Sequence, residues 1–323
     1  MITSRIVQAT DPVDLHLHTL ASDGFWTPEE LIRTVAERGF KVVAVTDHDN
    51  QRSVRTAMEL GAELGLIVIP GVEMTTTWNN RQVHLLVYGL EPSLTGYTNS
   101  AWNQALFDID ALMQERALDA RARFETAGKA LPSLEEILAG RVLWPFHVLS
   151  AAIKDGHAKN LKESAELLVS LGGDFNGDLP LDRVVDAAHQ AGGIAVIAHP
   201  GRGDSVGLVT EADIKAMLPE IAIDGVEAHY RSHSDSDTAL YRRIAHDHGL
   251  LISTGSDSHA PNKPVDPLPY RAGWASNLLG RLGVTVQAEN TNDRLWHEGL
   301  SPKPAAQPEP ASKSDENSER GNA

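Results

Sequence analysis

Strand-length apolar runs alternate with helix-like segments along most of this chain, and this alternation constrains the fold more than any other feature. The runs before residue 93 are Val13–Leu17, Lys41–Thr46, Leu66–Pro70 and Gln82–Tyr88, and those after residue 180 are Gly193–Ala198, Asp224–Ala228 and Leu250–Thr254. Helix-like segments lie between most of them. Repeated strand–helix units of this spacing predict an α/β domain with a parallel sheet, either open or closed into a barrel.

The first expected helix has three start signals that agree. Thr27 is a good N-cap residue, Pro28 fits the first helical position, and Glu30 stands three residues after the cap. Apolar residues between Leu31 and Ala36 then mark one face of the helix.

Composition divides the chain into three parts. Residues 93–178 are rich in Ala, Leu, Glu and Arg, and we expect them to form a helical insertion in the α/β domain, which comprises residues 1–92 and 179–300. Residues 301–323 carry four prolines and no aromatic residue, which predicts a disordered tail.

The overall composition excludes several classes of protein. The 323 residues include no Cys, which excludes disulfide scaffolds and thiolate-bound metals. The formal net charge of −16 argues against a broad basic face for duplex DNA. The longest apolar runs fall far short of the roughly 20 residues that span a bilayer, and the N-terminus has no apolar signal region, so we expect a cytoplasmic protein that does not enter membranes.

Histidines and carboxylates stand at or near the ends of the expected strands. The candidates are His16, His18, Asp23, the triplet Asp47-His48-Asp49, Glu73, His84, His199, Asp257 and His259. A single His near a strand end is more often structural, but six such signals in phase with six strand ends predict one shared site at the carboxyl edge of the sheet. Sets of His and carboxylate ligands are typical of zinc, manganese and iron.

The charge of such a site indicates its substrate. Asp23, Glu73 and Asp257 contribute three negative charges, so two or three divalent ions would leave a locally positive pocket that suits a phosphate group. The ions would also lower the pKa of a bound water and stabilise the displaced oxygen.

The motifs HLHTLASDG, VTDHD, GVE, HxxxYG, IAHPGR and GSDSHAP occur in this order. Together they resemble the PHP (polymerase and histidinol phosphatase) superfamily over roughly residues 13–300. The stand-alone branch that includes 3′,5′-nucleoside bisphosphate phosphatases, AMP phosphatase and 5′→3′ exoribonuclease AM is the most similar. The resemblance implies a distorted (β/α)7 barrel with up to three ions of manganese, zinc or iron.

The resemblance also implies which residues hold each ion. His16, His18, Glu73 and Asp257 would hold the first ion. Glu73 would bridge to a second ion, which His84 and His199 also bind. Asp23, His48 and His259 would hold the third.

Other positions match substrate contacts of that branch. Arg202, His147 and His233 would contact phosphate, and His233, His147 or His229 could supply a proton to the leaving group. The branch usually has Arg two residues before the histidine matched by His147, where this chain has Pro145. Trp78, Asn79 and Asn80 could also face substrate, although core packing suits Trp78 better.

The leading expectation is therefore a metal-dependent hydrolase that cleaves a phosphate monoester by attack of a metal-activated hydroxide. A nucleoside 5′-monophosphate or 3′,5′-bisphosphate is the expected substrate. Alternatives are a 5′→3′ exonuclease on short RNA, a phosphatase or cyclic phosphodiesterase of another metabolite, and a non-catalytic metal-binding module. An amidohydrolase is a further alternative, but that class commonly uses a bridging lysine, and Lys41 lies at the wrong end of its strand. The oligomeric state is left open.

Overall fold

Seven strands form a nearly closed barrel in the computed structural model, which describes residues 5–92, 100–174, 177–202, 208–260 and 266–304. In spatial order the strands are β2 (Pro12–Leu17), β3 (Val42–Val45), β4 (Ile67–Trp78), β5 (Arg81–Tyr88), β7 (Ile194–Ile197), β8 (Gly225–Tyr230) and β9 (Leu251–Gly255). A parallel bridge between Leu17 and Ser258 brings the end of β9 back to β2. The expected distorted (β/α)7 barrel is confirmed.

One strand of this barrel runs against the others. β5 is antiparallel to both β4 and β7, whereas β2–β3, β3–β4, β7–β8 and β8–β9 are parallel pairs. β4 is much longer than the expected Leu66–Pro70, and it continues through Glu73 because residues 71–78 pair with β5. Glu73 thus lies within a strand rather than after one.

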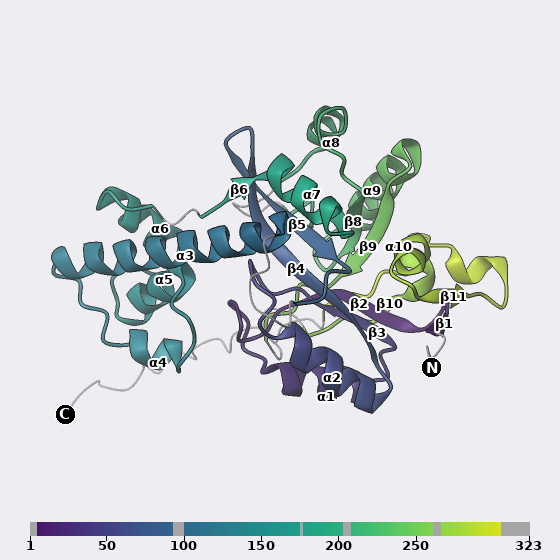
Figure 1. Cartoon of the computed structure of the whole chain (residues 1–323), viewed down its shortest axis with the longest axis horizontal. Helices are drawn as coiled ribbons and strands as arrows, with labels where there is room; N and C mark the ends of the chain where they lie inside the picture. Colours follow the sequence, from purple (N-terminus) through teal and green to yellow (C-terminus); the bar gives the residue numbers. More distant parts are fainter. Residues whose placement is uncertain (1–4, 93–99, 175–176, 203–207, 261–265, 305–323) are drawn as a thin grey trace, which may run out of the picture.

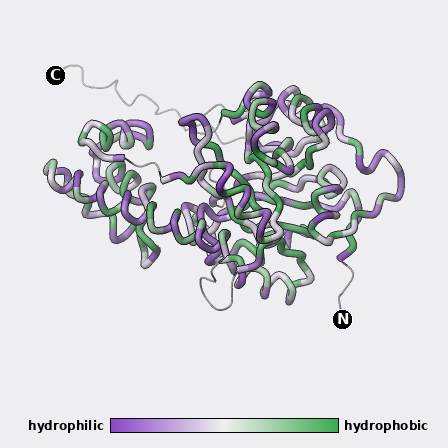
Figure 2. The backbone as a smooth tube through the Cα atoms, turned by 45° about the horizontal axis from the view of Figure 1, so that its top comes forward, coloured by the Kyte–Doolittle hydropathy of each residue, from purple (hydrophilic) through white to green (hydrophobic). Residues whose placement is uncertain are grey.

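Helices that flank the barrel in the described part of the chain include α1 (Pro28–Glu37), α2 (Val54–Leu64), α7 (Leu181–Gln190), α8 (Glu211–Met217) and α9 (Asp235–His248). The start of α1 is as expected, since Thr27 and Glu30 form a reciprocal capping box and Pro28 is the first helical residue. The helices pack around the outside of the strands (Figure 1), and hydrophobic stretches are prominent along the central strands (Figure 2).

Small elements extend the barrel at its edges. β10 (Tyr270–Arg271) pairs with β2, β6 (Leu179–Pro180) pairs with β4, and β1 (Ile6–Gln8) pairs with β11 (Thr285–Gln287) in a separate two-stranded sheet. The other C-terminal elements are η1 (Ala272–Ala275), α10 (Ser276–Arg281) and η2 (Thr291–Arg294). The apolar pattern did not predict these short elements.

Between β5 and β6, the described residues form four helices that make a lobe to one side of the barrel: α3 (Ala101–Thr126), α4 (Leu134–Leu138), α5 (Pro145–Lys154) and α6 (Leu161–Ser170) (Figure 1). The first half of α3 packs Trp102, Ile109 and Met113 into a core shared with the barrel strands. Its second half packs Ala117 and Phe124 into a core shared with α4, α5 and α6. One helix therefore belongs to two cores.

The expected insertion boundary at residue 93 and the tail from residue 305 lie outside the described residues. Residues 301–304 are described, and Ser301 accepts a hydrogen bond from the Trp296 indole at 2.9 Å. No helix in the described ranges combines the length and apolar character that a bilayer crossing needs.

Candidate metal centre

The carboxyl ends of the parallel strands and the paired strands β4 and β5 bring nine polar side chains together. They are His16, His18, Asp23, His48, Glu73, His84, His199, Asp257 and His259, the set expected from the sequence. His16 lies in β2, and His18 follows that strand directly. Glu73 and His84 lie on adjacent strands, and Glu73 stands two residue pairs away from the Thr75–His84 pair. These side chains are mostly buried, so the sequence has placed a polar cluster inside the barrel mouth.

Four ligand atoms of this cluster surround a common point. His16 Nε2 lies 3.1 Å from His18 Nε2 and 2.9 Å from Glu73 Oε2. His18 Nε2 lies 3.1 Å from both Glu73 Oε2 and Asp257 Oδ1, and His16 Nε2 lies 3.6 Å from that Asp257 oxygen. Tetrahedral bonds of about 2.0 Å separate ligand atoms by roughly 3.3 Å. The spacing of these four atoms therefore fits a divalent ion between them.

The second carboxylate oxygen of Glu73 faces another pair of histidines. Glu73 Oε1 lies 2.9 Å from His84 Nδ1 and 2.9 Å from His199 Nε2. His48 Nε2 lies 3.5 Å from Glu73 Oε2, so His48, Glu73 and His84 also form a possible ligand group. Each oxygen of Glu73 thus faces different imidazoles, as a carboxylate that bridges two ions must.

A third group surrounds Asp23 in the loop after β2. Asp23 Oδ2 lies 3.1 Å from His259 Nε2 and 3.9 Å from His48 Nε2. Asp23 Oδ1 is buried, lies 3.7 Å from His18 Nδ1 and has no hydrogen-bond partner in the described part of the chain. A buried carboxylate oxygen without a donor is costly in a protein interior, and a bound cation would satisfy it.

Burial and close charges shift the pKa values of this cluster in opposite directions. Burial lowers the pKa of His48 to about 3 and that of His199 to about 4. Burial opposes protonation of His18, but hydrogen bonds to Asp257 and Glu73 raise its pKa to about 10. Burial also opposes ionisation of Glu73, yet the surrounding histidines hold the pKa of its carboxyl well below its usual range. The cluster therefore favours ionised carboxylates beside neutral imidazoles at His48 and His199, whereas the carboxylates hold protons on His16 and His18 that a bound divalent ion would displace.

Glu227 supports this cluster from behind and was not expected from the sequence as a site residue. This buried β8 residue accepts a hydrogen bond from His16 Nδ1 at 3.1 Å and one from the backbone N–H of His199 at 2.8 Å. With Nδ1 protonated, His16 presents the lone pair of Nε2 to the cluster. In the sequence, Glu227 is an acid inside an apolar run and stands six residues before His233.

Asp257 divides its two oxygens between the cluster and a second set of partners. Oδ1 faces His16 and His18, whereas Oδ2 accepts a hydrogen bond from the Tyr230 hydroxyl at 2.9 Å and pairs with Arg231 Nη1 at 2.9 Å. Arg202 Nη1 lies 3.6 Å from the same Oδ2, which places this expected phosphate contact at the edge of the cluster.

Two acids near the cluster accept hydrogen bonds from nearby N–H and hydroxyl groups instead of joining the ligand groups. Asp47 accepts hydrogen bonds from the backbone N–H and hydroxyl of Thr19 and from the Ser22 hydroxyl, and so shapes the loop that carries Asp23. Asp49 accepts from the backbone N–H and hydroxyl of Thr75. Neither acid occurs in the ligand groups of the described residues.

The backbone is strained where strands end at the cluster. Asp49, His199 and Asp257 have φ values of +55°, +26° and +54°, which non-glycine residues rarely adopt. Such strain is typical of functional sites, where the surrounding structure holds a side chain in a fixed direction.

His147 and His233 approach the site with one ring nitrogen committed to backbone. His147, at the start of α5, accepts at Nδ1 from the Trp144 N–H at 3.1 Å, so its neutral form carries a proton on Nε2. Burial lowers its pKa to about 4, and Arg141 reinforces the shift. His233 donates from Nδ1 to the Ala228 carbonyl at 3.1 Å, and burial lowers its pKa. His233 Nε2 lies against Gly201, where a Cβ would come within 2.9 Å.

His229 has a different environment. Its ring stacks on Trp274 with centroids 4.8 Å apart, and Nε2 accepts a hydrogen bond from Arg242 at 2.9 Å. These contacts hold it against Trp274 and Arg242, and we assign it no part in the hydrolysis.

Pro145 is the first residue of α5, and Arg141 lies in the loop just before this helix. Arg141 Nη1 donates to the carbonyl of Gly24, next to Asp23, at 3.2 Å. Trp144 is buried. The lobe therefore contacts the Asp23 loop through Arg141.

Trp78, Asn79 and Asn80 form the far end of the β4–β5 hairpin. The positive φ values of both asparagines match a two-residue hairpin turn, and Trp78 packs on the barrel core. Lys41 is exposed directly before β3, at the end of that strand opposite the cluster.

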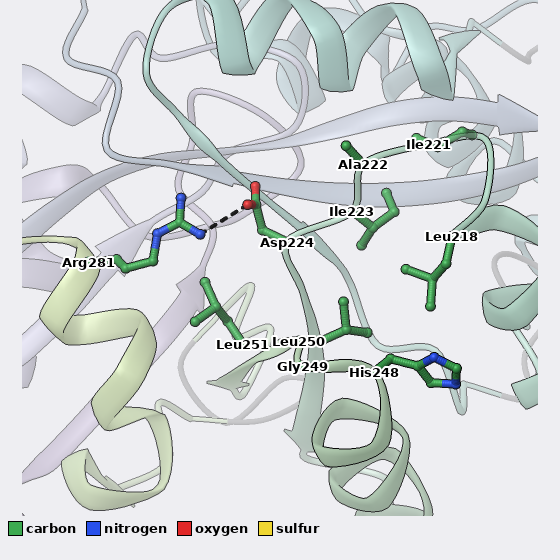
Figure 3. Close-up of a pocket in the computed structure, with 10 residues that line it drawn as sticks. All are labelled: Leu218, Ile221, Ala222, Ile223, Asp224, His248, Gly249, Leu250, Leu251 and Arg281. Carbon is green, nitrogen blue, oxygen red and sulfur yellow. Dashed lines mark hydrogen bonds and ion pairs between the residues drawn. The ribbon is translucent and has the colours of Figure 1, made fainter.

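A separate pocket lies at the other end of β8 and β9 (Figure 3). Apolar side chains such as Leu218 and Ile223 line it, and Asp224 pairs there with Arg281 at 3.1 Å. None of the nine cluster residues lines this pocket.

The fold and the cluster together define an α/β-barrel protein with a set of His and carboxylate ligands for divalent ions at the barrel mouth. Residues 14–139 match the family model described as the PHP domain. The chain is 31% identical over 265 residues to the 3′,5′-nucleoside bisphosphate phosphatase of Chromobacterium violaceum, which covers 78% of this chain and 88% of the relative. It is 28% identical over 293 residues to the 5′-3′ exoribonuclease Rnm of Escherichia coli, which covers 87% of this chain and 96% of the relative.

A solved structure from Chromobacterium violaceum, described as an amidohydrolase with bound sulfate, superposes with a TM-score of 0.65 at 30% identity. It covers 78% of this chain and 89% of its own. The chain belongs to the PHP family, and it is an enzyme of the hydrolase class.

Proposed function

We propose that this protein is a metal-dependent phosphatase that hydrolyses a phosphate monoester of a nucleotide, either a nucleoside 5′-monophosphate or a 3′,5′-bisphosphate. The observation that carries the proposal is the group of four ligand atoms from His16, His18, Glu73 and Asp257, with the cation of Arg202 beside it. We propose that the nine cluster residues bind two or three divalent ions of manganese, zinc or iron.

Bound ions would supply Lewis acidity and lower the pKa of a water molecule towards neutrality. The protein's own residues then have distinct tasks. Arg202 would bind two oxygens of the phosphate group in a bidentate fashion, since its Nη1 lies 3.6 Å from Asp257 at the edge of the cluster. His147, whose pKa burial lowers to about 4, is neutral near pH 7 and would donate from Nε2 to a phosphate oxygen. His233 turns an Nε2 that is unprotonated in the neutral ring toward the Gly201–Arg202 segment, which makes it the candidate to take a proton from the attacking water and pass it to the leaving oxygen.

Two of the relatives support a nucleotide as the substrate. One is named as a phosphatase of nucleoside bisphosphates and the other as an exoribonuclease, so both names concern phosphate groups on nucleotides. This chain has Pro145 where the stand-alone PHP branch usually has an arginine, so it lacks one cation at the start of α5. This difference favours a mononucleotide over a bisphosphate or an RNA end as the substrate.

The test is phosphate release from 5′-AMP, adenosine 3′,5′-bisphosphate and a 5′-phosphorylated RNA trinucleotide, with added Mn²⁺ and again after chelation. We expect release that the chelator abolishes and that Asp257→Asn lowers at least 100-fold. Arg281→Met is the matched control, because Arg281 also pairs with an aspartate but lies at the far end of β8.

Release of a nucleoside monophosphate from the trinucleotide, without release from the two mononucleotides, would replace the proposal by a short-RNA exonuclease. No release from any substrate in metal-loaded protein would overturn it.

A further inference from the structure

An exposed phenylalanine stands beside the cluster. Phe25 is 59% exposed, two residues after Asp23, whereas its neighbour Trp26 is buried. An exposed aromatic side chain next to a polar site is a candidate for ligand contact, because its ring offers a flat apolar face that a planar ligand can cover.

The backbone holds Phe25 in a fixed place relative to the cluster. Its N–H donates to the carbonyl of His259 at 2.6 Å, and His259 Nε2 lies 3.1 Å from Asp23. Gly24 sits so close to the chain that a Cβ would come within 2.7 Å of the Thr19 carbonyl, which fixes this turn tightly. The backbone of Phe25 is thus fixed two residues after Asp23 and hydrogen-bonded to His259, and these two residues would bind one ion.

The lobe supports one side of the ring. The Arg141 guanidinium carbon lies 5.9 Å from the ring centroid, and Arg141 is itself held by carbonyls of Gly24, Ile137 and Leu138. With a cation near one part of the ring and more than half of the residue exposed, Phe25 offers an aromatic surface to a planar ligand.

We propose that Phe25, backed by Arg141, is the stacking surface for the base of the substrate nucleotide and a determinant of specificity for nucleotides over sugar phosphates. This inference rests on the proposed function, since it places the base relative to the hydrolysed phosphate. Stacking on an aromatic side chain tolerates any base, because every base has a π-face. The site would therefore select nucleotides as a class.

The experiment compares 5′-AMP with ribose 5-phosphate, which carries the same phosphate ester but no base. We expect wild-type protein to prefer 5′-AMP in kcat/KM and Phe25→Ala to lower that preference by roughly 5- to 100-fold, mainly through KM for 5′-AMP. Phe25→Trp should keep it. Phe107→Ala is the matched control, because Phe107 is also an exposed phenylalanine but lies on α3 of the lobe.

A second readout does not depend on turnover. 2-Aminopurine riboside 5′-monophosphate loses fluorescence when its base stacks, and we expect wild-type protein to quench it and Phe25→Ala to quench it at least 5-fold less at equal ligand concentration. Unchanged preference and unchanged quenching in Phe25→Ala would overturn the inference while leaving the phosphatase intact. Phe25-dependent quenching without phosphate release would uphold the stacking site and overturn the proposed function instead.

Discussion

Acids at neighbouring strand ends perform different tasks in this protein. Asp257 offers one oxygen to the cluster, whereas the oxygens of Asp47 and Asp49 accept hydrogen bonds from backbone N–H groups and hydroxyls. The difference follows from the donors around each carboxylate. At the scale of single residues, therefore, a position at a strand end does not by itself make an acid a ligand.

Glu227 gives the sharpest residue-scale prediction. The amide of Glu227→Gln has one acceptor oxygen, so it can accept from His16 Nδ1 or from the His199 N–H but must set its NH₂ group against the other donor. We expect the dissociation constant for Mn²⁺ or Zn²⁺ to rise about 10- to 100-fold, measured by competition with a chromogenic chelator. Glu59→Gln, on the exposed side of α2, should leave it unchanged. Equal affinity in Glu227→Gln and wild type would refute this role.

The sequence was informative about the cluster but not about what holds it. The spacing of His16, Glu73 and His199 relative to apolar runs placed them at one end of the sheet. Glu227 and Arg231 could not be assigned in the same way, because their roles depend on which side chain of another strand faces them. That information is created only when the barrel closes.

Among the elements, α1 matters because the loop before it carries both Asp23 and Phe25. Thr27→Ala removes the side chain that accepts from the Glu30 N–H and should lower the free energy of unfolding by about 1 kcal/mol. Urea unfolding measures this change. Thr34→Ala, the same substitution inside the same helix, should be neutral or slightly stabilising, since alanine is the better helix former. A similar loss in both variants would show that the cap has no special role.

Most strands and helices followed from periodicity, and β4 shows where that reasoning ends. Its apolar run stops near Pro70, but the strand continues through Thr75, Thr76 and Thr77 because β5 supplies hydrogen-bond partners across the hairpin. Local composition cannot reveal such pairing. The antiparallel direction of β5 is a result of the same hairpin.

For the whole molecule, the cluster couples metal binding to stability. The carboxylates and imidazoles of the cluster come together only in the folded barrel, so an ion would bind the folded state alone. Such an ion adds to the free energy of unfolding. At a free metal concentration 100 times the dissociation constant, we expect the melting temperature to rise about 5 °C above that of the chelated protein. Scanning calorimetry measures the shift. The melting temperature of Glu73→Gln should differ little between the metal-loaded and the chelated protein. A shift as large as that of the wild type would place the stabilising ion elsewhere.

Helix α3 limits how this fold can diversify. Since its first half completes the barrel core and its second half completes the core of the lobe, no cut between residues 101 and 126 separates two self-contained modules. An exchange of the lobe would need a junction inside this continuous helix. The half of α3 that stays with the barrel must keep Trp102 and Ile109 in register with the barrel core. A foreign lobe could be joined only if its helix continues α3 with the same rotation about the helix axis. We therefore expect the lobe to change through single substitutions more readily than through exchange as a unit.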